Sequence, residues 1–450
     1  MDRVFDWSLV IRLCREIISE YVAFEGAIDD DTYDSDLKST CHYIAELISI
    51  GLENRKGVIP FHFRSDVWSS IEILSEDSDP TSERETQNID LGSSRNLADF
   101  CIKTIRGESI IAVIKYGSWV RTYLEKTTDI LERSAIGFDM IPEARKALER
   151  HLDFSVDSSL SIRAIYGLYF PVLVYLDNNW ARNNIDSIFP LEESKRSLFE
   201  AAWGTYLVFC RPERKIVKML KGQYSIAVER LKLITEDSGQ FLNQYEHVEC
   251  NLAEHLMILY WMGELELDEP DGLILRFWNN APESLREYAL QFMGFSLKHT
   301  EGNISAQVLE RFKRIWEFRY GIVSKSNGIS NELRSFSWWF LSNKLDDAWK
   351  LSQFEKALGL ISDFRLDLLV VKKLAEISSE MPRESIKCLD LIIRKIKNKS
   401  RIHLWRKSAE VIIKNALDSE DVETRTVAEN LINYLCSIRY LEFGYLLKAD

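Results

Sequence analysis

Apolar residues recur at helical spacing along most of the 450-residue chain. Between residues 366 and 377 they follow one another at steps of three, one, four and three, as Leu366, Leu369, Val370, Leu374 and Ile377. Residues at these steps share one face of an α-helix, which then packs against a neighbour. Asp363 precedes this stripe and is expected to cap the helix. Pro382 is expected in the first turn of the next helix, where proline is tolerated.

The helices of the C-terminal half follow a regular rhythm. Their predicted starts lie near residues 331, 346, 365, 382, 403 and 421. Helices of about 12–18 residues with joints of about two to six residues are typical of antiparallel hairpins. Two such helices use roughly 35–40 residues, the period of TPR and HEAT repeats. The sequence therefore predicts an all-α fold, an α-solenoid of antiparallel helical hairpins with TPR/HEAT-like repeats.

One short motif occurs twice in this half. A Pro-x3-Arg-x2-Ala sequence begins at Pro282, and an Asp-x3-Arg-x2-Ala sequence begins at Asp421, about four such periods later. We expect the first residue to cap a helix and the arginine to lie over the neighbouring turn. The alanine would mark the closest approach of two helices. The spacing resembles the second helix of HEAT repeats.

We predict two regions, an N-terminal helical region over 1–240 and a C-terminal HEAT/TPR-like repeat region over 241–450. The first is less regular, with helices predicted near 5–24, 35–53, 64–75, 96–126, 142–152, 158–178, 191–209, 213–231 and 239–263. Residues 75–96 (SEDSDPTSERETQNIDLGSSRN) have almost nothing to bury and are predicted to form an acidic, mobile surface loop. Residues 28–36 (IDDDTYDSD) lack the glycine and glutamate of an EF-hand and are predicted to form a solvated turn.

No strand region is predicted. The run Ser109–Ile114 is β-rich but fits a buried helix equally well. The longest apolar stretch, Ala164–Leu176, is interrupted by Pro171 and is shorter than the roughly 20 residues of a membrane span. It is predicted to be a buried helix.

Composition narrows the class of protein. The chain has only 19 Gly and nine Pro, too few turn residues for a many-stranded sandwich or barrel. Its net charge of −13 disfavours binding of the whole molecule to nucleic acid or to an anionic membrane. Seven scattered cysteines without a CxxC pair fit reduced thiols, and the N-terminus does not resemble a signal peptide. We therefore expect a cytoplasmic protein.

The search for catalytic chemistry finds little. Phosphate-binding, dinucleotide-binding and nucleophile-elbow motifs are absent from the sequence. The best metal-like cluster, on one predicted helix, comprises Glu246, His247, Cys250, Glu254 and His255. It has no partner motif and is better explained as an amphipathic helix. Cys41 and His42 are adjacent on a helix and so point about 100° apart. We expect no enzyme activity, no catalytic residue, no bound metal and no cofactor.

Two basic clusters could hold a nucleic-acid strand. The first spans residues 387–407 and contains Lys387, Arg394, Lys395, Lys397, Lys399, Arg401, Arg406 and Lys407. The second surrounds Trp316 and Phe318 and contains Arg311, Lys313, Arg314 and Arg319. Basic residues interleaved with aromatics can bind single strands, but in helical repeats they usually form a solvated face.

An aromatic segment precedes residue 350. Trp338, Trp339 and Trp349 could anchor a partner. However, Phe336, Trp339 and Phe340 are spaced for helix packing. We therefore expect mainly core packing there.

The C-terminal residues carry a family resemblance. The order runs from Ala253-Glu254-His255-Leu256-Met257 through Phe277-Trp278, Ala281-Pro282 and Leu285-Arg286 to Trp338-Trp339-Phe340, Asp347-x-Trp349-x-Leu351, Leu374-Ala375-Glu376 and Leu431-Ile432-Asn433. Over about residues 251–447 it resembles the helical-repeat sensor region of bacterial STAND-type antiphage NTPases and of related SIR2-linked defence proteins. These motifs are packing positions rather than catalytic ones. The chain lacks the NTPase and effector regions of that family.

The resemblance implies a non-catalytic sensor. Such a region would bind a phage structural protein of portal or terminase type and trigger an antiviral NTPase or effector in the same or another chain. The resemblance assigns no contact residue. Two alternatives remain: a general protein-interaction scaffold without a viral ligand, and a nucleic-acid-binding helical repeat.

Overall fold

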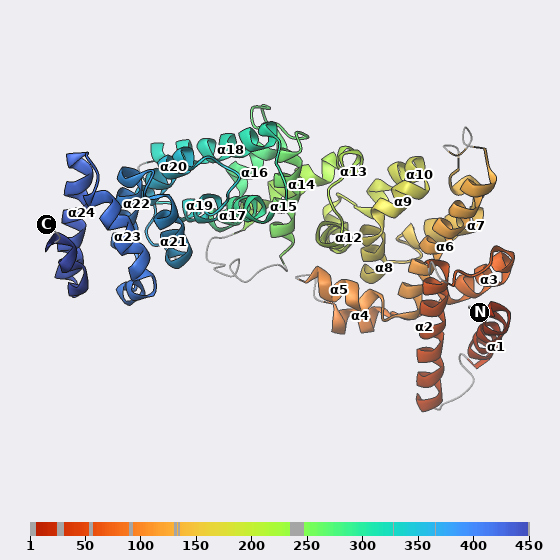
Figure 1. Ribbon diagram of the computed structural model, residues 1–450. Coiled ribbons are helices and arrows are strands. Elements are labelled where there is room, and N and C mark those ends of the chain that lie inside the picture. The colour runs from red at the N-terminus through yellow and green to blue at the C-terminus, as the bar shows by residue number, and fades with distance from the viewer. Residues whose placement is uncertain are drawn as a thin grey trace. The chain divides into compact units, whose positions relative to one another are not determined.

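The protein is helical throughout the part of the chain that the structure, a computed structural model, describes (Figure 1). The described residues are 6–24, 31–53, 57–89, 93–129, 133, 136–234, 247–326, 328–364 and 366–448. Within these ranges all regular elements are α- or 3₁₀-helices, which confirms the all-α prediction. The solenoid arrangement remains a prediction.

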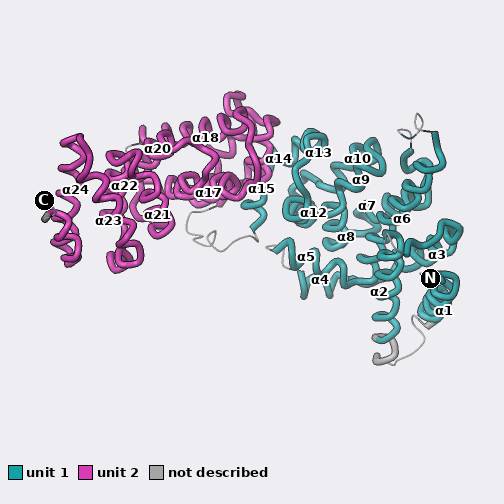
Figure 2. The backbone as a smooth tube through the Cα atoms, viewed as in Figure 1, with its two compact units in different colours: residues 1–226, 245–251 teal, residues 227–244, 252–450 magenta. Residues whose placement is uncertain are grey.

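The chain divides into two compact units (Figure 2). The first contains residues 1–226 and 245–251, and the second contains residues 227–244 and 252–450. The boundary predicted after residue 240 lies outside the described residues. In the ranges that the structure describes, no helix is long and apolar enough to cross a membrane.

The first unit is built around one buried helix. Its α-helices are α1 (Trp7–Phe24), α2 (Asp31–Glu53), α3 (Arg64–Ser75), α4 (Ser82–Asn88), α5 (Ser94–Cys101), α6 (Ile105–Thr127), α7 (Pro142–Leu152), α8 (Leu160–Leu168), α9 (Phe170–Leu176), α10 (Asn178–Asn183), α11 (Ile185–Ile188), α12 (Arg196–Phe209) and α13 (Arg214–Met219). Helix α6 contacts α2, α3, α7, α8 and α9. All six residues of 109–114 are buried within it, which confirms the helical interpretation of that run.

The tightest approach in this unit joins α8 to α12. A Cβ atom on Gly167 would lie 1.9 Å from the carbonyl oxygen of Ala202. Only a glycine lets the two backbones come this close. Short 3₁₀-helices complete the unit, including Phe61–Phe63, Phe138–Met140 (η3) and Glu193–Lys195.

The second unit consists of successive packed helices. After α14 (Lys221–Arg230) and α15 (Val248–Trp261), which contain the unit boundaries, come α16 (Leu273–Asn280), α17 (Glu283–His299), α18 (Ala306–Lys325), η7 (Asn331–Ser335), α19 (Phe336–Phe340), α20 (Asp347–Leu360), α21 (Asp367–Ile377), α22 (Pro382–Lys395), η8 (Lys399–Trp405), α23 (Arg406–Leu417), α24 (Val422–Ser437) and η9 (Leu441–Lys448). Helix α22 contacts α20, α21, α23 and α24, so it packs on the helices one and two places away from it on both sides. This contact pattern is typical of stacked hairpins.

Helix starts agree closely with the hydrophobic pattern where a cap or proline marks them. Helix α22 begins at Pro382, as predicted. In the repeated motif, Arg286 donates a hydrogen bond to the carbonyl oxygen of Ala281 and Arg425 to that of Ser419, both at 2.5 Å. The two arginines therefore lie over the preceding turn, and the alanines that follow them are fully buried.

Asp363 does not cap α21. The residue before that helix is Leu366, whose side chain makes no capping hydrogen bond. Asp363 instead accepts a hydrogen bond from Arg334 at 2.7 Å and lies 3.7 Å from the ammonium of Lys397. The Asp363 carboxylate therefore pairs with cations of neighbouring segments instead of capping α21.

The segment 75–96 is folded wherever it is described, which corrects the prediction of a surface loop. It contains α4, which is capped by Thr81, and the start of α5. Asp77 and Glu85 are buried in it. Residues 90–92 lie outside the described ranges. The turn predicted at 28–36 is also partly helical, because α2 begins at Asp31, while 28–30 are not described.

The stretch Ala164–Leu176 is buried over much of its length but is not one helix. Helix α8 ends at Leu168 and α9 begins at Phe170. Pro171 occupies the first turn of α9. A proline lacks the N–H that a continuous helix would need at this point.

We predict opposite effects for two helical glycine substitutions. Gly294→Ala would place a Cβ 2.4 Å from Cδ1 of the fully buried Trp339. Trp339 is fixed because its indole N–H donates to the carbonyl oxygen of Leu290. The substitution should lower the free energy of unfolding by about 1–3 kcal/mol. Gly321→Ala, which meets nothing within 4 Å, should raise it by about 0.5–1 kcal/mol. Denaturant titration measures both, and equal effects would contradict the packing described.

Candidate functional site

The metal-like cluster on α15 is not assembled as a site. Glu246 lies outside the described residues, and Cys250 and His255 are buried. Glu254 accepts a hydrogen bond from the hydroxyl of Tyr288 at 2.5 Å, and burial raises the pKa of its carboxyl. Among the described residues, no group of three or more His, Cys, Asp or Glu side chains is placed to hold a metal ion.

Cys41 and His42 serve separate contacts. The Cys41 side chain is fully buried, and burial raises the pKa of its thiol to about 12. The Nε2 atom of His42 lies 2.7 Å from the carbonyl oxygen of Ile102. A thiol with such a pKa is protonated at neutral pH and is a poor nucleophile.

The cations of the second basic cluster are all paired within the fold. Their carboxylate partners are contributed by other segments of the second unit. The pairs are Arg311 with Glu266, Lys313 with Asp346, Arg314 with Asp268 and Arg319 with Glu332. Charges neutralised in this way contribute little to phosphate binding.

Most cations of the run 387–407 are engaged in the same way. Five of them form ion pairs, namely Lys387 with Glu423, Arg394 with Asp390, Lys397 with Asp363, Arg401 with Asp367 and Arg406 with Glu410. The ammonium groups of Lys395 and Lys399 donate to main-chain carbonyl oxygens. Three of these ion pairs join different segments and two lie within single helices, so five of the eight cations of the run face a carboxylate.

The aromatic segment is divided between core and surface. Trp339 is fully buried, as the spacing predicted, whereas Trp338 and Trp349 are half-buried. The indole N–H of Trp349 donates to Glu317 at 3.0 Å, and the ammonium of Lys313 lies 5.4 Å from its ring centroid.

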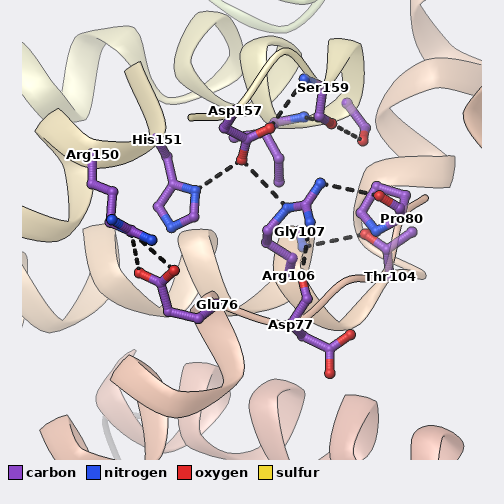
Figure 3. Close-up of polar contacts among 12 residues, drawn as sticks. Glu76, Asp77, Pro80, Thr104, Arg106, Gly107, Arg150, His151, Asp157 and Ser159 are labelled. Atoms are coloured by element: carbon purple, nitrogen blue, oxygen red, sulfur yellow. Dashed lines mark hydrogen bonds and ion pairs between the residues drawn. The ribbon is translucent and has the colours of Figure 1, made fainter. Parts of the chain in front are cut away.

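A buried polar network in the first unit was not found in the sequence. We call Glu85, Arg106, His151, Asp157 and Ser159 the polar clasp. Asp157 accepts hydrogen bonds from Nδ1 of His151 at 2.8 Å and from the Ser159 main-chain N–H at 3.0 Å. Its Oδ2 also lies 3.3 Å from Nε of Arg106 (Figure 3). The carboxylate thus joins the end of α7 to the starts of α6 and α8.

The clasp also holds the segment that precedes α4. The guanidinium of Arg106 donates to the carbonyl oxygens of Asp77 at 2.7 Å and Pro80 at 3.0 Å (Figure 3). From α4, Glu85 accepts hydrogen bonds from the main-chain N–H groups of Leu160 and Ser161 at the start of α8. An anion at a helix N-terminus is favoured by the unpaired N–H groups there.

Two buried nitrogen atoms of the clasp have no hydrogen-bond partner among the described residues, namely Nε of Arg106, which lies 3.3 Å from Asp157, and Nε2 of His151. A pocket of about 320 Å³ adjoins the clasp, and Nε2 of His151 is buried with no hydrogen-bond partner in the part of the chain that is described. Among the described residues, no serine or cysteine side chain bonds to this nitrogen, so a nucleophile–base pair is not assembled. The contacts of the clasp join α4, α6, α7 and α8.

A second, wider concavity also lies in the first unit. We call it the α10 groove, a space of about 940 Å³ lined by residues of α6, η3, α7, α9, α10 and α13. This volume is at the upper end of the roughly 300–1,000 Å³ typical of ligand sites. Asp177 fixes the groove wall, because its carboxylate accepts the N–H groups of Asn179 and Trp180 and that of Phe138 from η3.

The α10 groove presents polar groups that the fold does not use. Asn179 and Asn183 are exposed side chains on α10, and no hydrogen bond joins either carboxamide to another described residue. Trp180, between them, is buried and donates its indole N–H to Glu149 of α7 at 3.1 Å. The carboxamides of Asn179 and Asn183 therefore lie on a helix that is anchored by Trp180, and they line the open α10 groove.

Sequence reasoning missed both features for physical reasons. The clasp residues are polar and follow no helical period, and Glu85 lies in a segment with no apolar stripe. The groove had a readable signal, the run Asn178-Asn179-Trp-Ala-Arg-Asn183-Asn184. Four asparagines around one short helix are poor helix formers, so their presence needs another explanation.

Comparison with known proteins identifies no relative of established function. No family model and no curated protein matches the sequence. Among solved structures, an engineered protein from the Northeast Structural Genomics Consortium aligns over 96% of this chain and 95% of its own, with 12% sequence identity and a TM-score of 0.23. A TM-score this low supports no conclusion about fold family or function.

We predict that Asp157→Asn strongly destabilises the first unit. The substitution removes the charge that faces the largely buried guanidinium of Arg106 and one of the two carboxylate oxygens that accept from His151 and Ser159. Breaking such a pair from one side costs about 3–5 kcal/mol. Denaturant unfolding measures the loss. Asp153→Asn, at an exposed position of the same loop, is the control and should have little effect.

The stability difference between the wild type and Asp157→Asn should also depend on pH. Burial alone would raise the pKa of Asp157, but the His151 hydrogen bond and the Arg106 cation lower it below its ordinary 3.8. The stabilisation by Asp157 is therefore present above that ordinary value and is lost as pH falls through the lower folded-state pKa. The difference in unfolding free energy between wild type and Asp157→Asn should shrink as pH falls below about 4, where the Asp157 carboxylate begins to be protonated. A difference that grows below about pH 4 would contradict this assignment.

Proposed function

We propose that the chain is a protein-recognition module of helical repeats and serves as the sensor region of an antiphage defence system. It binds a phage structural protein of portal or terminase type. Binding then triggers an NTPase or effector in the same or another chain. The module itself performs no catalytic step.

The observation that carries the recognition role is the α10 groove. It is open and polar, it is built on anchored helices, and it presents Asn179 and Asn183 with unused hydrogen-bonding groups. Binding residues placed on a fixed scaffold lose little freedom when a partner docks. The clasp, in contrast, uses most of its polar groups in contacts between helices of the first unit.

The charge distribution favours protein over nucleic acid as the partner. Both basic clusters are largely neutralised by carboxylates and main-chain carbonyl groups of the same unit. A nucleic-acid site needs several cations that are free to replace counterions along the phosphates. The net charge of −13 acts in the same direction.

The antiphage assignment rests on the sequence resemblance over residues 251–447. Its motif positions Trp278, Leu285, Trp339 and Leu431 are fully or almost fully buried, as packing motifs should be. Their burial agrees with the interpretation of these motifs as packing positions, from which the proposal starts. A sensor must bind one state of its linked partner more tightly than another in order to shift the equilibrium.

We predict that the full chain, co-expressed with phage portal or terminase proteins, captures one of them in a pull-down. A stable complex would bury about 1,600 Å² in total. Capture should persist at moderate salt, because the proposed contacts are mainly neutral hydrogen bonds.

The alternatives give different results in the same experiment. Failure to capture any portal or terminase protein would favour a general scaffold. Binding to single-stranded RNA or DNA at low salt that falls steeply with added salt would favour the nucleic-acid alternative.

A further inference from the structure

We propose that the α10 groove binds an extended polypeptide segment by its main chain, with Asn179 and Asn183 as the reading residues. The inference rests on the proposed function, because it names the part of a protein partner that the module recognises. A carboxamide offers one acceptor and two donors. It therefore matches the C=O and N–H of a peptide group, whatever side chain that residue carries.

The spacing of the two carboxamides fits an extended chain. Asn179 and Asn183 are four residues apart on α10, so they share a face and are separated by about 6 Å along the helix axis. Peptide groups that face the same side of an extended strand repeat about every 6.6–6.8 Å. Each carboxamide can therefore meet every second peptide group of a strand that runs along α10.

The helix that carries them is held from both ends. At its start, the carboxylate of Asp177 accepts the Asn179 and Trp180 N–H groups at 3.0 and 2.9 Å. At its middle, Trp180 is anchored to Glu149 of α7. At its end, the Asn184 side chain donates to the Trp180 carbonyl oxygen at 2.8 Å. The side chains of Asn179 and Asn183 form none of these anchoring hydrogen bonds.

Asn178 also lines the groove, and its Oδ1 atom is buried without a hydrogen-bond partner in the described ranges. Leaving a buried acceptor unsatisfied costs free energy. This atom is screened from solvent, so the proposal rests on the exposed carboxamides of Asn179 and Asn183.

The charge of the groove favours a polypeptide over a nucleic acid. Its cations and carboxylates are equal in number among the described lining residues, namely Arg121, Arg145 and Lys215 against Asp139, Glu149 and Asp177. Arg145 is already paired with both Asp139 and Glu149. A groove balanced in this way offers no excess of positive charge for a phosphate backbone.

The aromatic side chains of the groove argue against a glycan. A sugar ring would need an open aromatic face for stacking. The guanidinium of Arg121 lies over the ring of Tyr175, 4.6 Å from its centroid, and Trp180 is only 4% exposed. The exposed carboxamides of Asn179 and Asn183 have no hydrogen bond to another described residue, and such groups suit a peptide main chain.

The test begins with a displayed library of random linear peptides selected on the full chain. Peptides selected by the wild type should bind Asn179→Ala/Asn183→Ala at least about tenfold more weakly, because two neutral hydrogen bonds are lost. Asn179→Asp/Asn183→Asp keeps the size and the acceptors but removes the donors, and should also weaken binding. Replacing single peptide N–H groups by N-methyl should weaken binding at alternate positions, which a side-chain reading mode would not show.

The matched control is Asn433→Ala, which removes an exposed asparagine from a helix of the second unit and should leave affinity unchanged. The thermal midpoints of the alanine variants should not fall below that of the wild type, because no hydrogen bond joins the altered side chains to other described residues and alanine is a better helix former than asparagine. Failure to select any peptide, or selected peptides that bind the double variants as tightly as wild type, would overturn the inference. Competition by single-stranded RNA or by oligosaccharides but not by peptides would also overturn it.

The pull-down separates this inference from the proposed function. If the wild type and the Asn179→Ala/Asn183→Ala variant capture a phage protein equally well, the groove is not the docking site although the sensor function stands. If the wild type captures none of the phage proteins while selected peptides still depend on Asn179 and Asn183, the groove inference stands without the antiphage function.

Discussion

The fold depends on buried carboxylates that are fully surrounded by donors at the joints between helices. Removing a carboxylate from water costs several kcal/mol unless cations or N–H groups replace the lost solvent. Glu85 and Glu332 each accept three or more hydrogen bonds, and so does Asp367. Their donors come from segments distant in sequence, for example Arg286 and Arg319 for Glu332. These carboxylates therefore specify which segments meet, in addition to the apolar core.

In the first unit this constraint links the clasp to the groove through α7. His151 at the end of α7 is held by Asp157, and Glu149, two residues earlier, anchors Trp180 in the wall of the groove. The clasp thus fixes α7, and α7 in turn holds the helix that carries Asn179 and Asn183. A recognition site on a preorganised support loses less entropy on binding than one on a free loop.

Much of the fold follows from the sequence, whereas the sites do not. Helices α3, α7 and α22 begin where the pattern placed them, because apolar stripes and prolines are local signals. The prediction of a surface loop around Glu85 was wrong because the stabilising partner of Glu85, Ser161, lies 76 residues away. A local sequence pattern does not indicate such a partner. Asp363 was misassigned for the same reason. Hydrogen bonds between distant polar residues carry no periodicity, so only the folded chain reveals them.

One chain of charges in the second unit has a consequence for substitution. Arg334 pairs with Glu287 on one side and with Asp363 on the other, and Asp363 in turn faces Lys397. The four groups alternate in sign and belong to α17, η7 and the segments before α21 and after α22. Reversing the charge of Arg334 alone would place like charges on both of its sides. This relay therefore tolerates a change of sign only when its neighbours change with it.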